Sequence, residues 1–156
     1  MTYSNVNIWR MPVAGGPAEQ VTQSGGTRGI ETADGKALVY QPGIDRSGLP
    51  VLVSSLSGRS TRQLVPCAYG FSVGTRGVYY YRCRPEGPPV VLGSQKPIEI
   101  RLIDPANGHD RAVATLPDLS YGGVFWGPQV SPDGSTILYA RMVNRGEDLM
   151  MVENFR

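Results

Sequence analysis

The segment SPDGSTILY, residues 131–139, places a tight-turn signal directly before an apolar run. Pro132 fixes its own backbone φ and favours a turn, and the Asp133 side chain can accept a hydrogen bond from the backbone two residues further on. Gly134 can adopt the positive φ that a tight hairpin turn needs. The segment therefore predicts a β-hairpin in which Asp133 has a structural role rather than a catalytic one.

The pattern of a glycine turn before an apolar run occurs three times in the chain. The apolar runs are residues 38–40, 78–80 and 137–139. The turn glycines Gly35 and Gly77 lie 42 residues apart, and the glycines of a second turn, Gly16 and Gly58, have the same separation. The next interval is longer because it contains a Pro- and Gly-rich insertion at 85–96, which predicts a loop.

A period near 42 residues is typical of four-stranded β-propeller blades. We divide the chain into an outer half-blade (1–26), a blade (27–66), a blade with an insertion (67–117) and a last blade that lacks its outer strand (118–156). The predicted fold is all-β, a partial β-propeller of about three and a quarter antiparallel blades and 13 strands. The predicted strands are residues 5–12, 18–22, 27–36 (with its turn), 37–41, 49–56, 61–65, 68–73, 78–83, 97–103, 111–116, 124–130, 136–142 and 148–155.

The incomplete blades at both ends predict that the chain is the C-terminal arc of a larger propeller. A propeller ring must close because its terminal faces are otherwise left uncovered. As an isolated piece, the arc is therefore expected to expose apolar faces and to self-associate. Two alternatives stay open, namely a self-contained β-sandwich built from the same hairpins and a ring closed by two or more copies.

The composition excludes several classes of protein. Hydrophobic residues make up 40% of the 156 residues and charged residues 18%, which is too apolar for a disordered chain. The 20 Gly and 13 Pro exclude a helix bundle. A net charge of +2 gives no strong field, so no nucleic-acid partner is predicted. No apolar run is long enough to span a membrane, and the N-terminus lacks the pattern of a signal peptide.

Residues 130–139 resemble the repeat of TolB-like, WD-repeat-like bacterial β-propellers, in which Ser-Pro-Asp-Gly precedes a polar pair and an apolar run that ends in an aromatic residue. Residues 32–35, TADG, are a weakened copy of this repeat, and residues 74–77, GTRG, have lost both Pro and Asp. The segment 148–156 resembles the last strand of such propellers, and residues 7–22 resemble the outer hairpin of a blade.

This resemblance implies a non-catalytic module that binds a protein, a peptide or a small molecule. Similar propellers form the C-terminal part of bacterial signalling or regulatory proteins, some with an N-terminal kinase or winged-helix domain. The resemblance favours an extracytoplasmic, periplasmic location, and a cytoplasmic one stays open. The alternative function is the propeller portion of a hydrolase, such as a prolyl-oligopeptidase-like gating domain, or of a propeller carbohydrate-active enzyme.

The sequence contains no recognisable catalytic, metal-binding or nucleotide-binding motif. His109 is the single histidine, and its predicted place is an exposed outer turn at 107–110. A Ser-His-Asp triad would have to use this residue, and no nucleophile motif accompanies it. One histidine and two cysteines at this spacing do not predict a zinc site, and no phosphate-binding loop occurs. The sequence therefore predicts no enzyme activity, no metal and no cofactor.

Cys67 and Cys83 open the first strand and close the second strand of the middle blade. If residues 74–76 form a three-residue turn, the two cysteines lie opposite one another within disulfide reach. A disulfide would imply an oxidising compartment. If the turn has two residues, the two side chains point to opposite faces of the sheet and pack as small buried residues. Both outcomes stay open at this point.

The predicted binding surface is the rim around one mouth of the propeller channel. Aromatic residues on the innermost strands and polar residues in the loop at 141–147 would line this rim, and the insertion at 85–96 would border the same face. The candidate residues are Tyr69, Phe125, Trp126, Asn144, Arg145 and Glu147. For each aromatic residue, the alternative role is packing between blades.

Overall fold

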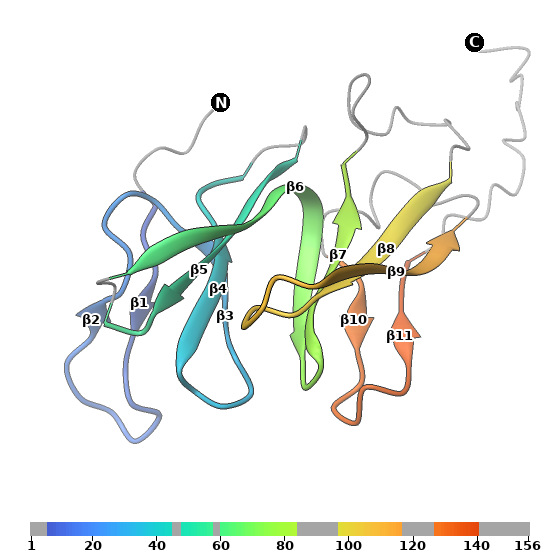
Figure 1. Cartoon of the computed structure of the whole chain (residues 1–156). Helices are drawn as coiled ribbons and strands as arrows, with labels where there is room; N and C mark the ends of the chain where they lie inside the picture. Colours follow the sequence, from blue (N-terminus) through green and yellow to red (C-terminus); the bar gives the residue numbers. More distant parts are fainter. Residues whose placement is uncertain (1–5, 45–47, 58–59, 84–96, 117–126, 141–156) are drawn as a thin grey trace, which may run out of the picture.

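The computed structural model describes residues 6–44, 48–57, 60–83, 97–116 and 127–140, which form eleven strands and no helix (Figure 1). No helix within these ranges could cross a membrane. The strands are β1 (Trp9–Arg10), β2 (Glu19–Gln20), β3 (Thr27–Glu31), β4 (Ala37–Gln41), β5 (Leu49–Ser55), β6 (Thr61–Gly74), β7 (Gly77–Arg82), β8 (Ile98–Ile103), β9 (Asp110–Leu116), β10 (Gln129–Val130) and β11 (Ile137–Leu138).

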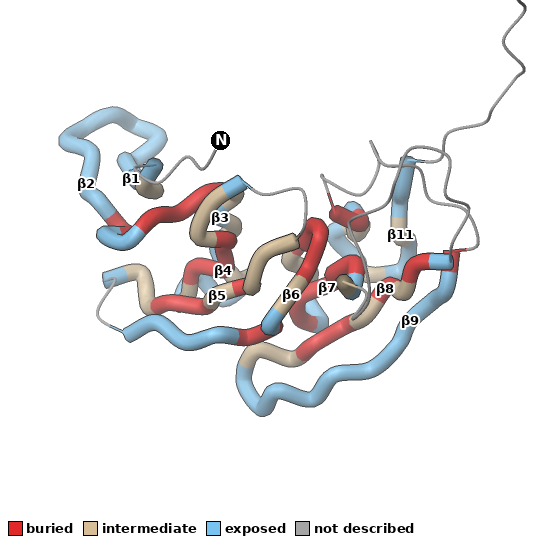
Figure 2. Tube along the Cα trace, turned by 90° about the horizontal axis from the view of Figure 1, so that it is seen from above, coloured by how far each residue is buried: buried red, intermediate tan, exposed pale blue. Residues whose placement is uncertain are grey.

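All the strand pairs are antiparallel and join strands that follow one another in the chain. The strands β3 to β9 form one sheet in sequence order, and the hairpins β1–β2 and β10–β11 lie at its two sides (Figure 1). Seen from above, the strands have a fan-shaped arrangement (Figure 2). This architecture confirms the predicted all-β fold and is consistent with a partial β-propeller.

The strand β6 differs from the sequence-based prediction, because the separate strands expected at 61–65 and 68–73 form one continuous strand, Thr61–Gly74. Its first part pairs with β5 and its second part pairs with β7. The β5–β6 register shifts between Leu49 and Leu52, where β6 passes from one pairing to the other. We call β3, β4, β5 and residues 61–65 the first blade, and residues 68–74, β7, β8 and β9 the second blade.

The structure has two strands fewer than predicted, because two predicted strands form the single strand β6 and another lies outside the described residues. Thirteen strands were predicted, and the strand expected at 148–155 lies outside the described residues. Each of the eleven observed strands overlaps a predicted one; β4 has the predicted bounds, and β1, β2, β3, β10 and β11 are shorter than predicted. Antiparallel neighbours in sequence order are what four-stranded blades require.

The β3–β4 turn is built around the side chain of Asp34. Thr32 Oγ1 donates to Asp34 Oδ1 at 2.6 Å, and the backbone N–H of Lys36 donates to the same oxygen at 3.1 Å. The N–H of Ala37 donates to Thr32 Oγ1 at 3.0 Å. Gly35 has a φ of 66°, which a residue with a side chain adopts only at a cost. Asp34 and Gly35 therefore form the turn as the sequence predicts, because the aspartate accepts hydrogen bonds and the glycine adopts a positive φ.

The β10–β11 turn repeats this hydrogen-bond network residue by residue. Ser131 Oγ donates to Asp133 Oδ1 at 2.5 Å, and the N–H of Ser135 donates to the same oxygen at 3.0 Å. The N–H of Thr136 donates to Ser131 Oγ at 3.0 Å, and Gly134 has a φ of 70°. These bonds to the charged carboxylate lower the pKa of Asp133 to about 2. The structural role predicted for Asp133 is confirmed.

The strand β7 separates two hydrophobic clusters, because its successive side chains point to opposite faces. Val78 and Tyr80 pack against the first blade, in a cluster with Val39 and Val51. Tyr81 packs on the other face, in a cluster that includes Ile137 of β11. Buried positions concentrate in the central strands, whereas β9 and the β1–β2 hairpin are exposed (Figure 2). The core is therefore made where neighbouring blades face each other.

The structure joins Cys67 to Cys83 in a disulfide with a Cα–Cα distance of 5.5 Å. The β6–β7 turn has two residues, since Gly74 pairs with Gly77, and this register alone would put the two cysteines on opposite faces. A bulge between Ala68 and Phe71 shifts the register by one residue. The cysteines are opposite each other because of this bulge, and not because of a three-residue turn.

Candidate functional site: a groove at the blade junction

Of the six predicted rim residues, the described part of the chain includes Tyr69 alone. Tyr69 is 6% exposed and packs with Tyr81, Ile98 and Leu116 between the second blade and β11. Its observed place is the packing alternative considered above. The other five candidates, Phe125, Trp126, Asn144, Arg145 and Glu147, lie outside the described residues, as do the 85–96 insertion and the 141–147 loop.

The structure shows no catalytic or metal-binding constellation around the described acids and the single histidine. His109 is exposed in the β8–β9 turn, where its backbone N–H donates to Asn107 Oδ1 at 2.8 Å. In the described part of the chain, no three His, Cys, Asp or Glu side chains lie close enough together to hold a metal ion. His109 is thus an exposed turn residue in the structure.

A groove of about 680 Å³ lies between the first and second blades, at the end of the junction where the hairpin turns gather. The β3–β4 and β6–β7 turns border it, together with the end of β5, the start of β6 and the β8–β9 turn. Its size falls within the usual range for small-molecule pockets. We call this cavity the junction groove.

The junction groove is lined by both apolar and polar residues. Val53 belongs to the core cluster between the blades, and Val73 packs against this cluster. Ser54, Ser55 and Ser60 also line the groove, and the hydroxyls of Ser54 and Ser55 are hydrogen-bonded to Ser55 O and Ser57 Oγ. The lining therefore combines apolar and polar residues from one continuous sheet and its turns.

Arg62 connects the two blades across the junction groove. Its guanidinium donates a hydrogen bond to the backbone carbonyl of Pro105, in the β8–β9 turn. Arg62 is the second residue of β6, in the first blade, whereas Pro105 lies in the β8–β9 turn of the second blade. This contact lies on the surface, so it positions the two walls and contributes little to stability.

Each of the two carboxylates of the junction groove accepts hydrogen bonds from its own turn through one oxygen, Oδ1. Asp34 accepts the hydrogen bonds from Thr32 and Lys36, and these bonds hold its pKa below the ordinary value. Asp104 Oδ1 accepts the N–H of Ala106 at 2.7 Å. Neither carboxylate forms an ion pair within 4 Å to any described residue.

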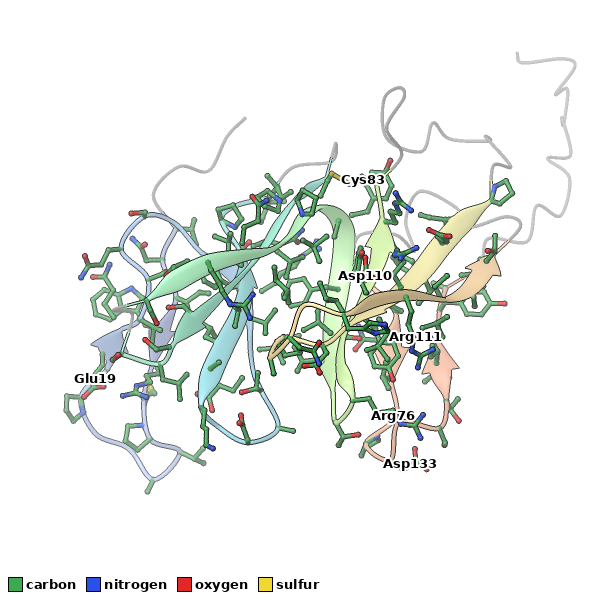
Figure 3. All side chains as sticks on the ribbon, in the orientation of Figure 1. Glu19, Arg76, Cys83, Asp110, Arg111 and Asp133 are labelled. Atoms are coloured by element: carbon green, nitrogen blue, oxygen red, sulfur yellow. A yellow bond between two sulfur atoms is a disulfide. The ribbon has the colours of Figure 1, made fainter. Side chains whose placement is uncertain are left out.

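The cation Arg76 also lines the junction groove, and its side chain makes no hydrogen bond or ion pair with the described residues. Its Nε lies 3.7 Å from the position that a Cβ would take at Gly134. Figure 3 accordingly shows Arg76 and Asp133 on adjacent turns at the same end of the molecule. Arg76 therefore borders the groove at the β6–β7 turn, and the end of its side chain lies against the β10–β11 turn.

A second charged cluster, on the second blade, is internally satisfied. Arg101 pairs with Asp110 at 3.0 Å and with Glu99 at 3.1 Å. The Tyr80 hydroxyl donates to Asp110 Oδ2 at 2.8 Å, and burial together with this bond raises the pKa of Tyr80 to about 12. Arg82 adds a bond to Glu99 at 3.3 Å. This cluster ties β7, β8 and β9 together and leaves no uncompensated charge for a ligand.

The residues of the junction groove were not identified from the sequence. In the repeat, Arg76 occupies the sequence position that Asp34 and Asp133 hold in the other two copies, but its turn has two residues where theirs have four. The pairing of distant turns across a blade junction was not visible in the sequence.

Comparison with known proteins supports the fold. No family model matches the chain, and no curated protein matches it. The solved structure of a TolB-like protein from Agrobacterium tumefaciens is similar, with a TM-score of 0.60 and 17% sequence identity. The similarity covers 90% of this chain and 55% of that one, so the chain spans about half the length of its structural neighbour. At this identity the comparison shows a TolB-like fold and nothing about activity.

Proposed function

We propose that this chain is a non-catalytic binding module within a larger bacterial β-propeller, and that it binds a segment of a partner protein in the junction groove. The observation that carries this proposal is the junction groove itself, an open cavity of about 680 Å³ between two rigid blades. Its lining combines the apolar side chains of Val53 and Val73 with serine, threonine and charged residues. The hydrolase and carbohydrate-enzyme alternatives have no supporting observation among the described residues.

The proposal of a larger propeller is supported by the β1–β2 hairpin. Ile8 and Val21 pack against the first blade, whereas Trp9 is 58% exposed and Met11 is 60% exposed. Trp9 and Met11 share the face of the hairpin opposite to Ile8, since side chains alternate along a strand. An exposed apolar face of this kind is where a preceding blade of the intact protein would pack.

The proposed location is outside the cytoplasm, most simply the periplasm. The disulfide between Cys67 and Cys83 supports it, because structural disulfides persist mainly in oxidising compartments. In the intact protein the propeller would follow a signalling or regulatory domain. Sequencing of the coding region upstream of Met1 tests both points, with an in-frame membrane span or export signal as the expected result.

Selection of peptides from a random library on the purified chain tests the proposed function. The variant Ala106→Trp places a bulky side chain in the junction groove, whereas Ala112→Trp makes the same change on exposed β9, outside it. We expect the recovered peptides to bind the Ala112→Trp variant as they bind the natural chain and to lose binding to the Ala106→Trp variant. Recovery of no peptides, or equal binding to both variants, would contradict the proposal.

A further inference from the structure

The two terminal hairpins correspond to different halves of a blade. Gly16, in the β1–β2 turn, precedes Gly58 by the repeat period, so β1 and β2 correspond to the third and fourth strands of the first blade. The β10–β11 turn has the hydrogen-bond network of the β3–β4 turn, which joins the first and second strands. The β1–β2 hairpin is therefore the outer half of a four-stranded blade, and the β10–β11 hairpin is the inner half.

The described strands amount to two complete blades and two halves, because β6 serves both the first and the second blade. The two complete blades lie between the halves, so the β1–β2 and β10–β11 hairpins are at opposite ends of the arrangement (Figure 1). Two copies joined head to tail would turn these halves into complete blades and hold six blades in all. Closed propellers have about four to eight blades.

Each terminal hairpin has one packed face and one exposed face. Ile8 packs against the first blade, whereas Trp9, on the opposite face, is 58% exposed. Ile137 packs against the second blade, whereas Leu138 is 65% exposed. Side chains alternate between the two faces along a strand. Each hairpin therefore keeps a large apolar side chain uncovered on the face turned away from its own neighbouring blade.

A joined blade with the strand order β10–β11–β1–β2, half from each copy, would cover both exposed faces. Trp9 and Met11 would lie on the same face as Ile137 and contact the second blade of the copy that supplies β10 and β11. Leu138 would lie on the same face as Ile8 and contact the first blade of the other copy. The pairing would also use one edge of β1 and one edge of β11, which have no strand partner among the described residues.

We infer that two copies of this chain associate head to tail into a closed ring, in which β1 of each copy pairs with β11 of the other. This inference rests on the proposed function, and it names a second copy as the source of the remaining blades of the larger propeller. A heterologous contact that closes after two copies leaves no uncovered end. The junction groove lies between two complete blades of one copy, so the ring would carry two such grooves.

The test is sedimentation equilibrium of the full chain, for which we expect twice the chain mass of 16.9 kDa. Two variants place charge at the two ends, namely the double variant Trp9→Asp and Met11→Asp, and the variant Leu138→Asp. These side chains are exposed, so we expect both variants to fold and to raise the dissociation constant of the dimer about tenfold or more. The control is Ala112→Asp on exposed β9. Ala112 pairs with Arg101 on the face turned towards the first blade, so we expect a change of less than about twofold.

An equimolar mixture of the two end variants tests the head-to-tail arrangement. The unchanged last end of one variant can pair with the unchanged first end of the other, so we expect the mixture to regain the mass of a dimer. Contact between like ends would be lost in one variant alone and would not be restored by mixing.

Three results would overturn the inference, namely a monomeric natural chain, a loss of the dimer in one end variant alone, and no recovery on mixing. A monomer is also the expected result if the strand predicted at 148–155 pairs with β11 in place of a second copy. The peptide selection tests the junction groove separately. If a monomeric chain still returns groove-dependent peptides, the proposed binding function stands and only the ring of two copies is wrong.

Discussion

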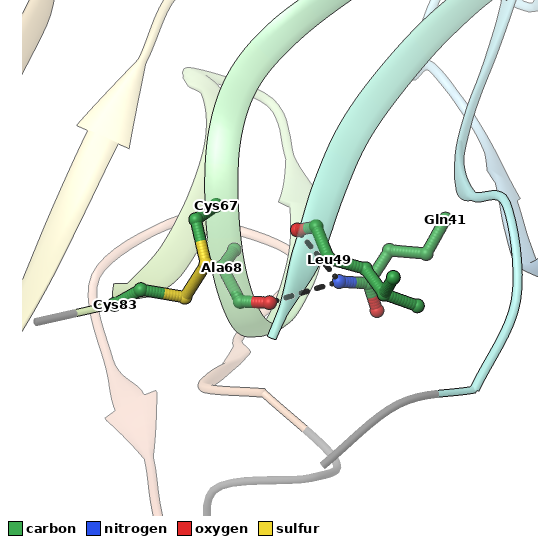
Figure 4. The surroundings of a disulfide bond; sticks show 5 residues. All are labelled: Gln41, Leu49, Cys67, Ala68 and Cys83. Carbon is green, nitrogen blue, oxygen red and sulfur yellow. Dashed lines mark hydrogen bonds between the residues drawn. A yellow bond between two sulfur atoms is a disulfide. The ribbon is translucent and has the colours of Figure 1, made fainter. Parts of the chain in front are cut away.

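The junction between the first and second blades has two ends that differ in packing. At one end of β7, the disulfide between Cys67 and Cys83 is packed against Gly48, and Gln41 bridges three strands (Figure 4). At the other end, beyond Gly77, the blades separate and leave the junction groove. We call the first end the locked end.

This difference separates a packed end, which holds the two blades together, from an open end, which is the proposed binding site. At the locked end, Gln41 Nε2 donates to the carbonyl of Ala68 at 3.0 Å and to that of Leu49 at 3.3 Å. Gln41 is 3% exposed, and it satisfies carbonyls at the point where β6 changes partners. The blades are thereby fixed to one another, so the walls of the groove can remain apart without losing their relative position.

The largest effect on the locked end is expected from Gly48→Val. A Cβ at this position would lie 2.3 Å from Cys83 Sγ and 2.7 Å from Cys67 Sγ, and the φ of 93° disfavours any side chain. Strain and overpacking together predict a loss of about 4 kcal/mol in the free energy of unfolding, measured by urea denaturation. Gly43→Ala is the control, because its Cβ would meet no atom within 4 Å, and a comparable loss there would contradict the explanation.

Removal of the disulfide by the double substitution Cys67→Ala and Cys83→Ala is expected to cost about 3 kcal/mol, as is usual for a loop of this length. The separation of the two cysteines is 16 residues. The same substitutions should reduce the penalty of Gly48→Val, because the sulfur atoms that it meets are gone. A double-mutant cycle by urea denaturation measures this coupling, and additive effects would show that Gly48 and the disulfide do not interact.

Substitution of Gln41 by Leu is expected to lower the free energy of unfolding by about 2 kcal/mol, because two carbonyls at the locked end lose their donor. Gln20→Leu is a matched control, since Gln20 is exposed and donates to the carbonyl of Thr22 alone. Thermal unfolding measures the loss of stability in each of the two variants. A smaller loss for Gln41→Leu than for Gln20→Leu would exclude a bridging role for Gln41.

The smallest effect concerns the turn at Asp133, at the groove end of the molecule. The folded-state pKa of Asp133 is about 2, below its ordinary value of 3.8, so its ionised form stabilises the fold. This contribution is complete above pH 4 and is lost as the pH falls towards 2. Asp133→Asn should therefore reduce the acid dependence of the unfolding midpoint between pH 4 and 2. An unchanged dependence would show that the turn bonds do not favour the ionised carboxylate.

The sequence was sufficient to predict those features that depend on local chemistry. The Asp-Gly turns at Asp34 and Asp133 formed as expected because their hydrogen bonds lie within six residues. The continuity of β6 was missed, because the repeat places a blade boundary at 66–67, where the chain in fact stays extended. The bulge between Ala68 and Phe71 was also invisible, although it sets the register of both cysteines.

The binding site was less predictable than the fold. The junction groove depends on how turns from two blades come together, which is a property of three-dimensional packing. Tyr69 was selected for its aromatic character, but an aromatic residue on an inner strand is equally suited to the core, where the structure places it. Arg76 replaces the turn aspartate of the other two copies, but its charge alone does not predict that its side chain lies against the β10–β11 turn.

The central claim is that partners bind at the open end of the blade junction and not at the locked end. Amide hydrogen exchange of the full chain, with and without a peptide recovered by the library selection, tests it directly. We predict added protection in residues 74–77 and 104–106, and no change in residues 48–52 or 67–68. Protection confined to the residues around the disulfide, or to β9, would contradict the account.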